Sequence, residues 1–317
     1  MQFTPDILCF LHSQPPANAN SGHPKRCDFG FARGSQRNHP LLQYLLISVE
    51  AVSLKNAKRY TVILTQASAR IILAAAILIS GGLSAQKGYA ASLRVAVASN
   101  FQSTAKRLTA QYTVQTGNTI RFSFASTGTL YTQIAQGAPY DVFLAADTQR
   151  PQKAIEQGLA LSSPSCTYAQ GTLALVSSDP ETKVTAQTLR NAPSGRLAIA
   201  NPQTAPYGRA AKQALQALQL WQLWQPHLVR GNNIAQAYQF VATGNAELGL
   251  VAASQLPTNA KNHWLLPPAL YDPILQGAVV ISTSQQQEAA KAFVEFLCSR
   301  DAAKTIASQN YMIPQRP

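Results

Sequence analysis

Uncharged hydrogen-bonding residues gather at four places where an expected strand gives way to an expected helix. Hydroxyl and amide side chains at such junctions lie beside the free N–H groups of a helix's first turn, whose dipole favours an anion. None of the four segments contains Asp or Glu, which would repel an anion. The segments are Ala98-Ser99-Asn100, Ala125-Ser126-Thr127-Gly128, residues 201–208 (NPQTAPYG) and Gly231-Asn232-Asn233.

Together the four segments predict a cage of neutral donors around an oxyanion that is fully deprotonated at neutral pH. The same cage would reject a protonated oxyanion, because no acceptor meets its O–H group. Each segment taken alone also fits an ordinary helix N-cap, and Tyr207 alone also fits a packed ring. The prediction of an anion site therefore rests on the four segments as a set.

Patterns typical of catalysis are missing from the sequence. It has no G-x-S-x-G nucleophile motif, no phosphate-binding P-loop and no H-x-x-x-H pair. Asp141 and Asp147 flank one expected strand, where they would either form an acid or metal-binding pair or end the strand and hold a turn. We expect no catalytic residue, no bound metal cation and no cofactor, and hence no enzyme.

The elements that must position the four segments follow from the spacing of apolar residues. Alternation predicts strands, and spacing of three to four predicts helices. Strands alternating with helices favour an α/β fold with parallel sheets, whose carboxyl edges bind ligands. The expected strands are 93–97, 120–124, 142–146, 197–200, 248–252 and 278–281, and residues 171–182 are expected to form a strand and a turn. The expected helices are 101–117, 129–136, 211–218, 234–244 and a last helix with an apolar stripe over 289–297, preceded by a capping box at Ser284-x-x-Gln287.

The first part of the chain is expected to lie outside this fold. We expect residues 1–54 to be a non-folded extension or sequence upstream of the true start. The first methionine after Met1 is Met312, which suggests that translation starts at a non-AUG codon downstream of Met1. Residues 55–91 predict a secretory signal, with basic residues before the apolar run 71–79 and small residues after it. That run is shorter than the roughly 20 residues that span a bilayer. We therefore expect export to the periplasm through a cleaved signal, with a membrane anchor as the alternative.

Composition narrows the class further. Hydrophobic residues make up 46% of the 317, enough for a core, while charged residues make up only 12%. The net charge of +13 does not form a basic face interleaved with aromatics, so we expect no nucleic-acid partner. Export would leave Cys166 and Cys298, which either form one disulfide or remain two buried thiols.

The ordered motifs resemble the periplasmic molybdate-binding protein family. They are RVAVASNF at 94–101, SFASTGTLYTQI at 123–134, GAPYDVFLAAD at 137–147, GRLAIANP at 195–202 and APYG at 205–208. The resemblance covers essentially residues 92–315. It implies a type II periplasmic binding protein, with two α/β lobes joined by a two-strand hinge. The first lobe would take residues 92–170 and 256–317, and the second lobe residues 171–255.

Carried over position by position, the resemblance implies five ligand-binding residues. The first segment supplies Ser99 and Asn100, and the second supplies Thr127, where the family usually has Ser. Tyr207 and the backbone N–H of Ile234 complete the set. Many members have a Tyr where this chain has Ala252, so the Tyr207 phenol would have to replace its hydroxyl.

The resemblance also implies a function. The protein would bind molybdate and tungstate as a monomer and deliver them to an inner-membrane ABC permease and its ATPase. Three alternatives remain at this point. They are capture of another oxyanion such as sulfate or thiosulfate, an oxyanion-processing hydrolase that uses Asp141 or Asp147, and the ligand-sensing domain of a regulator.

Overall fold

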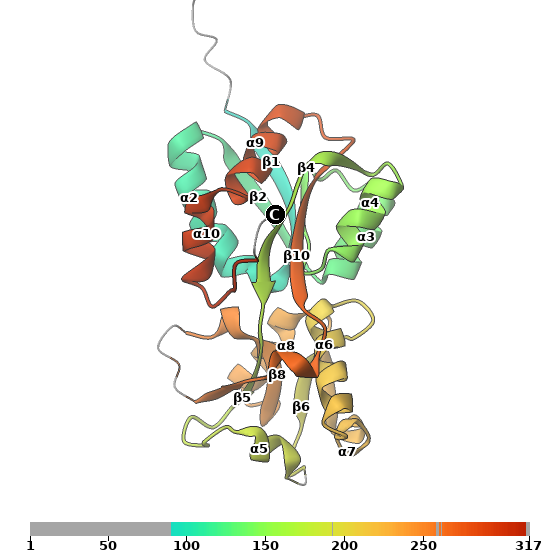
Figure 1. The fold of residues 1–317 in the computed structure, drawn as a ribbon, viewed down its shortest axis with the longest axis vertical. Helices are drawn as coiled ribbons and strands as arrows, with labels where there is room; N and C mark the ends of the chain where they lie inside the picture. Colours follow the sequence, from blue (N-terminus) through green and yellow to red (C-terminus); the bar gives the residue numbers. More distant parts are fainter. Residues whose placement is uncertain (1–89, 192, 258–259, 261, 315–317) are drawn as a thin grey trace, which may run out of the picture. The chain divides into compact units, whose positions relative to one another are not determined.

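The computed structural model describes residues 90–191, 193–257, 260 and 262–314, and these form two lobes, each built on one sheet (Figure 1). The expected extension at 1–54 and nearly all of the expected signal at 55–91 lie outside the described residues. Within the described ranges, no helix has the length and apolar character needed to cross a bilayer.

The first lobe has a five-stranded sheet in the order β2-β1-β3-β10-β4. β1 is parallel to β2 and β3, whereas β10 is antiparallel to both of its neighbours. The sheet is therefore mixed, and the expected parallel arrangement holds only for β1, β2 and β3, because the chain enters β10 from the other lobe and runs against β3. The strands are β1 (Ser92–Ala98), β2 (Thr119–Ala125), β3 (Val142–Leu144), β4 (Ala160–Gly171) and β10 (Ile274–Ile281).

Helices cover both faces of this sheet. Leu93, Val95 and Val97 of β1 are fully buried on one face, where each side chain contributes about 1.5–3 kcal/mol by leaving water. That face packs against α2 (Gln102–Thr116), α9 (Gln287–Leu297) and α10 (Arg300–Ala307). The opposite face, which includes Ala96, packs against α3 (Thr127–Ala135) and α4 (Gln149–Glu156).

The second lobe has a five-stranded sheet in the order β7-β6-β8-β5-β9. β6 is parallel to β7 and β8, and β5 is antiparallel to β8 and β9. The strands are β5 (Leu173–Ser177), β6 (Leu197–Ala200), β7 (Leu228–Gly231), β8 (Leu248–Ala252) and β9 (His263–Leu265). The helices of this lobe are α5 (Ala186–Arg190), α6 (Pro206–Ala217), α7 (Trp221–Trp224) and α8 (Ile234–Ala242). The described residues also form 3-10 helices at η1 (Ser99–Phe101), η2 (Gln225–His227), η3 (Ala253–Gln255) and η4 (Pro268–Leu270).

Two crossing segments join the lobes. β4 leads directly into β5 around Gly171, and the chain returns through Ile274 at the start of β10, which pairs with Gly171 (Figure 1). The Leu173 N–H donates to the Tyr271 hydroxyl at 3.1 Å and ties the two crossings together. The return to the first sheet, which we expected from residue 256, comes only at Ile274, because β9 pairs with β5 in the second sheet.

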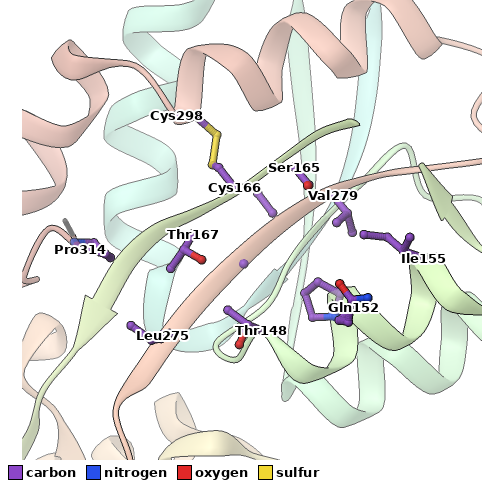
Figure 2. Close-up of a pocket in the computed structure, with 13 residues that line it drawn as sticks. Thr148, Gln152, Ile155, Ser165, Cys166, Thr167, Leu275, Val279, Cys298 and Pro314 are labelled. Carbon is purple, nitrogen blue, oxygen red and sulfur yellow. A yellow bond between two sulfur atoms is a disulfide. The ribbon is translucent and has the colours of Figure 1, made fainter. Parts of the chain in front are cut away.

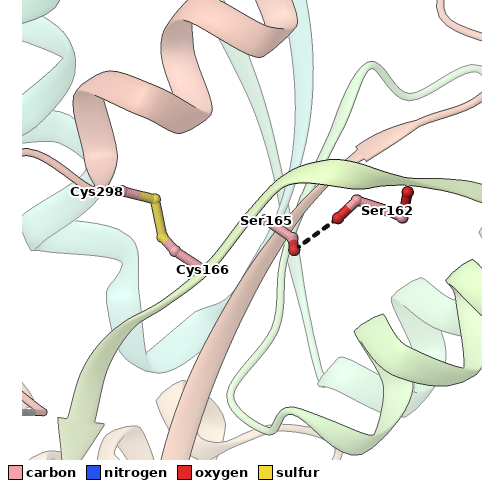
Figure 3. Close-up of a disulfide and its surroundings, with 4 residues drawn as sticks. All are labelled: Ser162, Ser165, Cys166 and Cys298. Carbon is pink, nitrogen blue, oxygen red and sulfur yellow. Dashed lines mark hydrogen bonds between the residues drawn. A yellow bond between two sulfur atoms is a disulfide. The ribbon is translucent and has the colours of Figure 1, made fainter. Parts of the chain in front are cut away.

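Local features of the first lobe also differ from the sequence expectation. α9 begins at Gln287 with Gln286 as its N-cap, so the expected capping box is wrong. The Ser284 hydroxyl instead donates to Asp141 Oδ1 at 2.7 Å. Of the two states left open for the cysteines, the structure has the disulfide, which joins Cys166 of β4 to Cys298 at the end of α9 with Cα atoms 6.3 Å apart (Figure 3).

Candidate functional site

A small cavity between the lobes is lined by all five residues predicted to bind a ligand. It measures about 10 Å³, which is close to the space of one water molecule. No lining residue carries a charged side chain, so the cavity is built from apolar groups and neutral polar groups. The first lobe lines it with Ala98, Ser99, Asn100, Ala125, Ser126, Thr127 and Ala146, and the second lobe lines it with Ala205, Pro206, Tyr207 and Ile234.

Thr127 opens helix α3 and offers a hydroxyl proton at the cavity. Ser126, the N-cap, accepts a hydrogen bond from the Thr129 N–H, which fixes this first turn. Thr127 is 1% exposed, and its Oγ1 accepts the N–H of Ala146 at 3.0 Å. Since the oxygen acts as acceptor in that bond, the proton of Thr127 remains available for a ligand.

Ser99 connects the first lobe to a helix N-terminus of the second lobe. Its Oγ accepts the N–H of Ala235, in the first turn of α8, at 3.4 Å. The Asn233 N-cap side chain accepts the N–H of Gln236 at 3.0 Å. The Ile234 N–H is the first of this helix and has no protein acceptor among the described residues. An anion at the cavity would satisfy this N–H and gain from the helix dipole.

Tyr207 lines the cavity from the first turn of α6, but its hydroxyl lies at the hinge. The hydroxyl oxygen accepts the Gln276 Nε2–H at 3.4 Å. It also packs so closely on Gly171 that a Cβ at that position would lie 1.9 Å from it, so any larger residue there would displace the Tyr207 hydroxyl. Burial raises the pKa of Tyr207 well above its usual value, so the phenol keeps its proton at physiological pH.

Asn100 has its amide directed at the same hinge. Its Nδ2 donates to Gln276 Oε1 at 2.9 Å and to the Tyr311 hydroxyl at 3.0 Å. Its Oδ1 is buried and has no hydrogen-bond partner within the described part of the chain. The resemblance did not identify Gln276, Tyr168 or Tyr311, because isolated polar residues in apolar strands or near the chain end carry no motif.

The two aspartates do not form a pair. Asp141 lies just before β3, where its carboxylate accepts the Arg94 N–H at 2.6 Å and the Ser284 hydroxyl. Asp147 follows the other end of β3 and pairs with Arg150 and, at 3.7 Å across the lobes, with Arg209. Among the described residues no group of acidic, His or Cys side chains is arranged to hold a metal ion. Both aspartates therefore hold structure, and their arrangement offers no acid–base pair.

Contacts outside the cavity also join the lobes. The Gly128 N–H donates to the Thr204 carbonyl at 2.8 Å, and Arg209 Nη1 donates to Gln149 Oε1 at 2.9 Å. A Cβ on Gly128 would lie 2.8 Å from the same carbonyl oxygen, so the close approach of the lobes requires glycine there. Together with the Ser99 contact to α8, these bonds show that the lobes are closed on the cavity.

A larger groove lies away from the site, on the first lobe. It measures about 590 Å³ and is lined by residues of α4, β4 and β10, together with the disulfide (Figure 2). Thr148, Gln152 and Thr167 are among its few polar side chains, and apolar groups form most of its wall. It contains none of the four junction segments, so it lacks the convergent donors of the cavity.

Comparisons with known proteins define first the class and then the family. A family profile for bacterial extracellular solute-binding proteins matches residues 93–311. The molybdate-binding protein ModA of Rhodobacter capsulatus is 42% identical over 218 residues, which cover 68% of this chain and 86% of that protein. ModA of Azotobacter vinelandii is 41% identical over 240 residues, which cover 74% and 95%.

The fold agrees with these relatives. The solved periplasmic molybdate-binding protein of Azotobacter vinelandii matches with a TM-score of 0.68 and 37% identity, over 70% of this chain and all of that chain. The sulfate-binding protein SubI of Mycobacterium tuberculosis shares the fold at 13% identity and a TM-score of 0.57. The chain belongs to the bacterial extracellular solute-binding proteins and, within them, to the periplasmic molybdate-binding protein family. The expected type II binding-protein fold is thereby confirmed.

Proposed function

We propose that this protein captures molybdate in the cavity between its lobes and delivers it to an ABC permease and its ATPase in the inner membrane. The observation that carries the proposal is the convergence of uncharged donors from both lobes on one cavity. The relatives named as molybdate-binding proteins support the choice of ion. The same residues, Ser99, Asn100, Thr127, Tyr207 and Ile234, are proposed as its ligand-binding set.

The donors suit a fully deprotonated dianion. The Thr127 hydroxyl and the Ile234 N–H both have hydrogen atoms that no acceptor among the described residues uses. Helices α3, α6 and α8 all begin at residues that line the cavity, so the positive ends of their dipoles converge there. A hydrogen bond to a charged group contributes about 1.5–3 kcal/mol, and several of them together offset the loss of the ion's hydration.

Closure of the lobes completes the site. Each lobe presents only part of the donor set, so the ion gains all of its bonds only when the lobes meet. The Ser99 to Ala235 contact and the Gly128 to Thr204 contact exist only in this closed arrangement, since their partners belong to different lobes. The ion enters an open form, and the hinge around Gly171 and Ile274 brings the halves together.

Size sets the specificity among these dianions. Molybdate and tungstate are nearly equal in size, so the protein binds both. Sulfate is smaller, and a rigid cage leaves it with fewer contacts. The protein works as a monomer in the periplasm, after export through the signal proposed within residues 55–91.

Calorimetric titration of residues 91–317 tests the proposal. Molybdate and tungstate should bind with similar dissociation constants, and sulfate should bind at least tenfold more weakly, a difference of about 1.4 kcal/mol. The double variant Ser99→Ala, Thr127→Ala should lose at least tenfold in molybdate affinity. Thr132→Ala is the matched control, because Thr132 lies on the same helix and its hydroxyl donates to the Gly128 carbonyl, its one side-chain bond among the described residues. Preference for sulfate over molybdate, or equal affinity in the double variant, would refute the assignment.

A further inference from the structure

Gln276 is a fully buried amide on the strand that joins the lobes. It lies on β10, two residues after Ile274, where the chain re-enters the first lobe. Its Oε1 accepts from Asn100 Nδ2 at 2.9 Å, and its Nε2 donates to the Tyr207 hydroxyl at 3.4 Å. One side chain therefore contacts a proposed ligand residue of each lobe.

An irregularity in strand pairing positions this side chain. Gln276 pairs with Ala169 and Gly277 pairs with Thr167, so Tyr168 of β4 has no partner in the ladder and forms a bulge. Bulges of this kind redirect side chains beside functional sites. The Tyr168 hydroxyl lies 3.3 Å from Gln276 Oε1 and 3.2 Å from the Ala145 carbonyl oxygen, so it adds a further contact that fixes the amide in place.

The direction of these bonds decides which hydrogen-bonding atoms of Asn100 and Tyr207 remain free. The Tyr207 oxygen accepts the Gln276 N–H, so the Tyr207 proton is free to be donated elsewhere. Asn100 donates its Nδ2 to Gln276, which leaves Asn100 Oδ1 buried with no partner in the part of the chain that the structure describes. A buried acceptor without a partner costs about 1–3 kcal/mol.

A half-turn of both amides gives the network a second direction. Gln276 Nε2 would then donate to Asn100 Oδ1, and the Tyr207 hydroxyl would donate to Gln276 Oε1. Asn100 Nδ2 would take the place of its unpaired Oδ1 and become the free donor. The backbone carbonyl of Asn100 would stay paired in this second arrangement, because the Ser254 hydroxyl donates to it at 3.2 Å. In either direction the Gln276 amide couples Asn100 to Tyr207, since it must donate to one of them and accept from the other.

We propose that Gln276 is a positioning residue for anion binding, which sets the hydrogen-bond direction of Asn100 in the first lobe and Tyr207 in the second through one buried amide. This inference rests on the proposed function, because its effect is measured on the ion that the cavity holds. Gln276 does not line the cavity, so it acts through these two neighbours.

Calorimetry with molybdate on four proteins tests the role. Gln276→Met keeps the side-chain length and removes both ends of the amide, and it should weaken binding by about tenfold, the equivalent of one hydrogen bond to a charged group. Gln276→Glu keeps the shape but accepts from both neighbours, so it should bind more weakly than Gln276→Met. Ser284→Ala is the matched control, because it removes another buried hydrogen bond of the first lobe, far along the chain from the junction segments. It should keep the wild-type affinity while lowering the apo melting temperature.

A double-variant cycle separates positioning from loss of stability. In a Tyr207→Phe background, Gln276→Met should lose clearly less than tenfold, because the coupled proton is already missing. Wild-type protein that binds no oxyanion would overturn the proposed function and this role with it. Wild-type protein that binds molybdate while Gln276→Met binds equally well, or loses the same factor in both backgrounds, would overturn the positioning role alone. If Gln276→Met does not fold, Gln276→Glu replaces it in the test: weaker molybdate binding than wild type supports the positioning role, and equal binding overturns it.

Discussion

Replacing Thr127 by Val should weaken molybdate binding by between about ten- and a hundredfold. Val keeps the branched shape at a position that is 1% exposed, but it removes the hydroxyl at the cavity. The lost bond to a charged group is worth about 1.5–3 kcal/mol, and each 1.4 kcal/mol corresponds to about tenfold in the dissociation constant.

The same substitution has a second effect that must be measured separately. Thr127 Oγ1 accepts the Ala146 N–H at 3.0 Å, so Val leaves that buried donor without its partner. This should lower the free energy of unfolding of the ligand-free protein by about 1–3 kcal/mol. Urea unfolding of the apo form measures the stability effect, and calorimetric titration at a temperature where all variants are folded measures the binding effect.

Thr127→Ser is the matched control. Ser retains the hydroxyl for both bonds and matches the residue usual in the family, so its dissociation constant should stay within about threefold of wild type, less than the value of one hydrogen bond. If Thr127→Val binds molybdate as tightly as Thr127→Ser, the hydroxyl does not contact the ion and the donor-cage reasoning is refuted at this position.

Arg209→Ala removes a partly exposed ion pair with Asp147 across the lobes. Molybdate affinity should therefore fall by up to about fivefold at low salt and by less at high salt. Calorimetry that finds an equal loss of affinity at both salt concentrations would contradict an electrostatic contribution to closure. Burial raises the pKa of Tyr168, so the folded state keeps a proton that the unfolded chain loses above about pH 10. Above that pH the free energy of unfolding should fall by up to about 1.4 kcal/mol per pH unit because of this tyrosine. Urea unfolding should show a shallower fall for Tyr168→Phe, and an unchanged slope would contradict that assignment. The double variant Cys166→Ser, Cys298→Ser opens a disulfide with a sequence separation of 132 and should lose about 2–5 kcal/mol of stability, with molybdate affinity unchanged because neither residue lines the cavity; a weakened affinity would show that the bond shapes the site.

The sequence predicted those parts of the fold in which burial repeats regularly. Alternating apolar residues at 93–97 correspond to β1, because one face of that strand is wholly buried. Gly117 and Gly244 were expected to end helices, and both take positive φ there, at 73° and 70°. The junction segments could be recognised because parallel strands bring their carboxyl ends to one edge.

Other features were missed because long-range contacts determine them. β4 was not expected, since its Ser-rich stretch at 162–165 is polar on an edge strand of the sheet. The antiparallel direction of β10 follows from the second crossing between the lobes, which no local pattern records. The hydrogen bond from Gln276 to the Tyr207 hydroxyl was missed, because the two residues are 69 positions apart in sequence. Only the folded chain shows that bond.

The most direct test of the donor cage is a crystal structure of residues 91–317 grown with molybdate, with anomalous scattering used to locate molybdenum. One strong peak should lie in the cavity between Ser99, Thr127 and Ile234, and only hydroxyl, amide and backbone N–H groups should contact the ion. A cavity without a peak, or an ion held against an acidic side chain or in the groove beside the disulfide, would contradict the account.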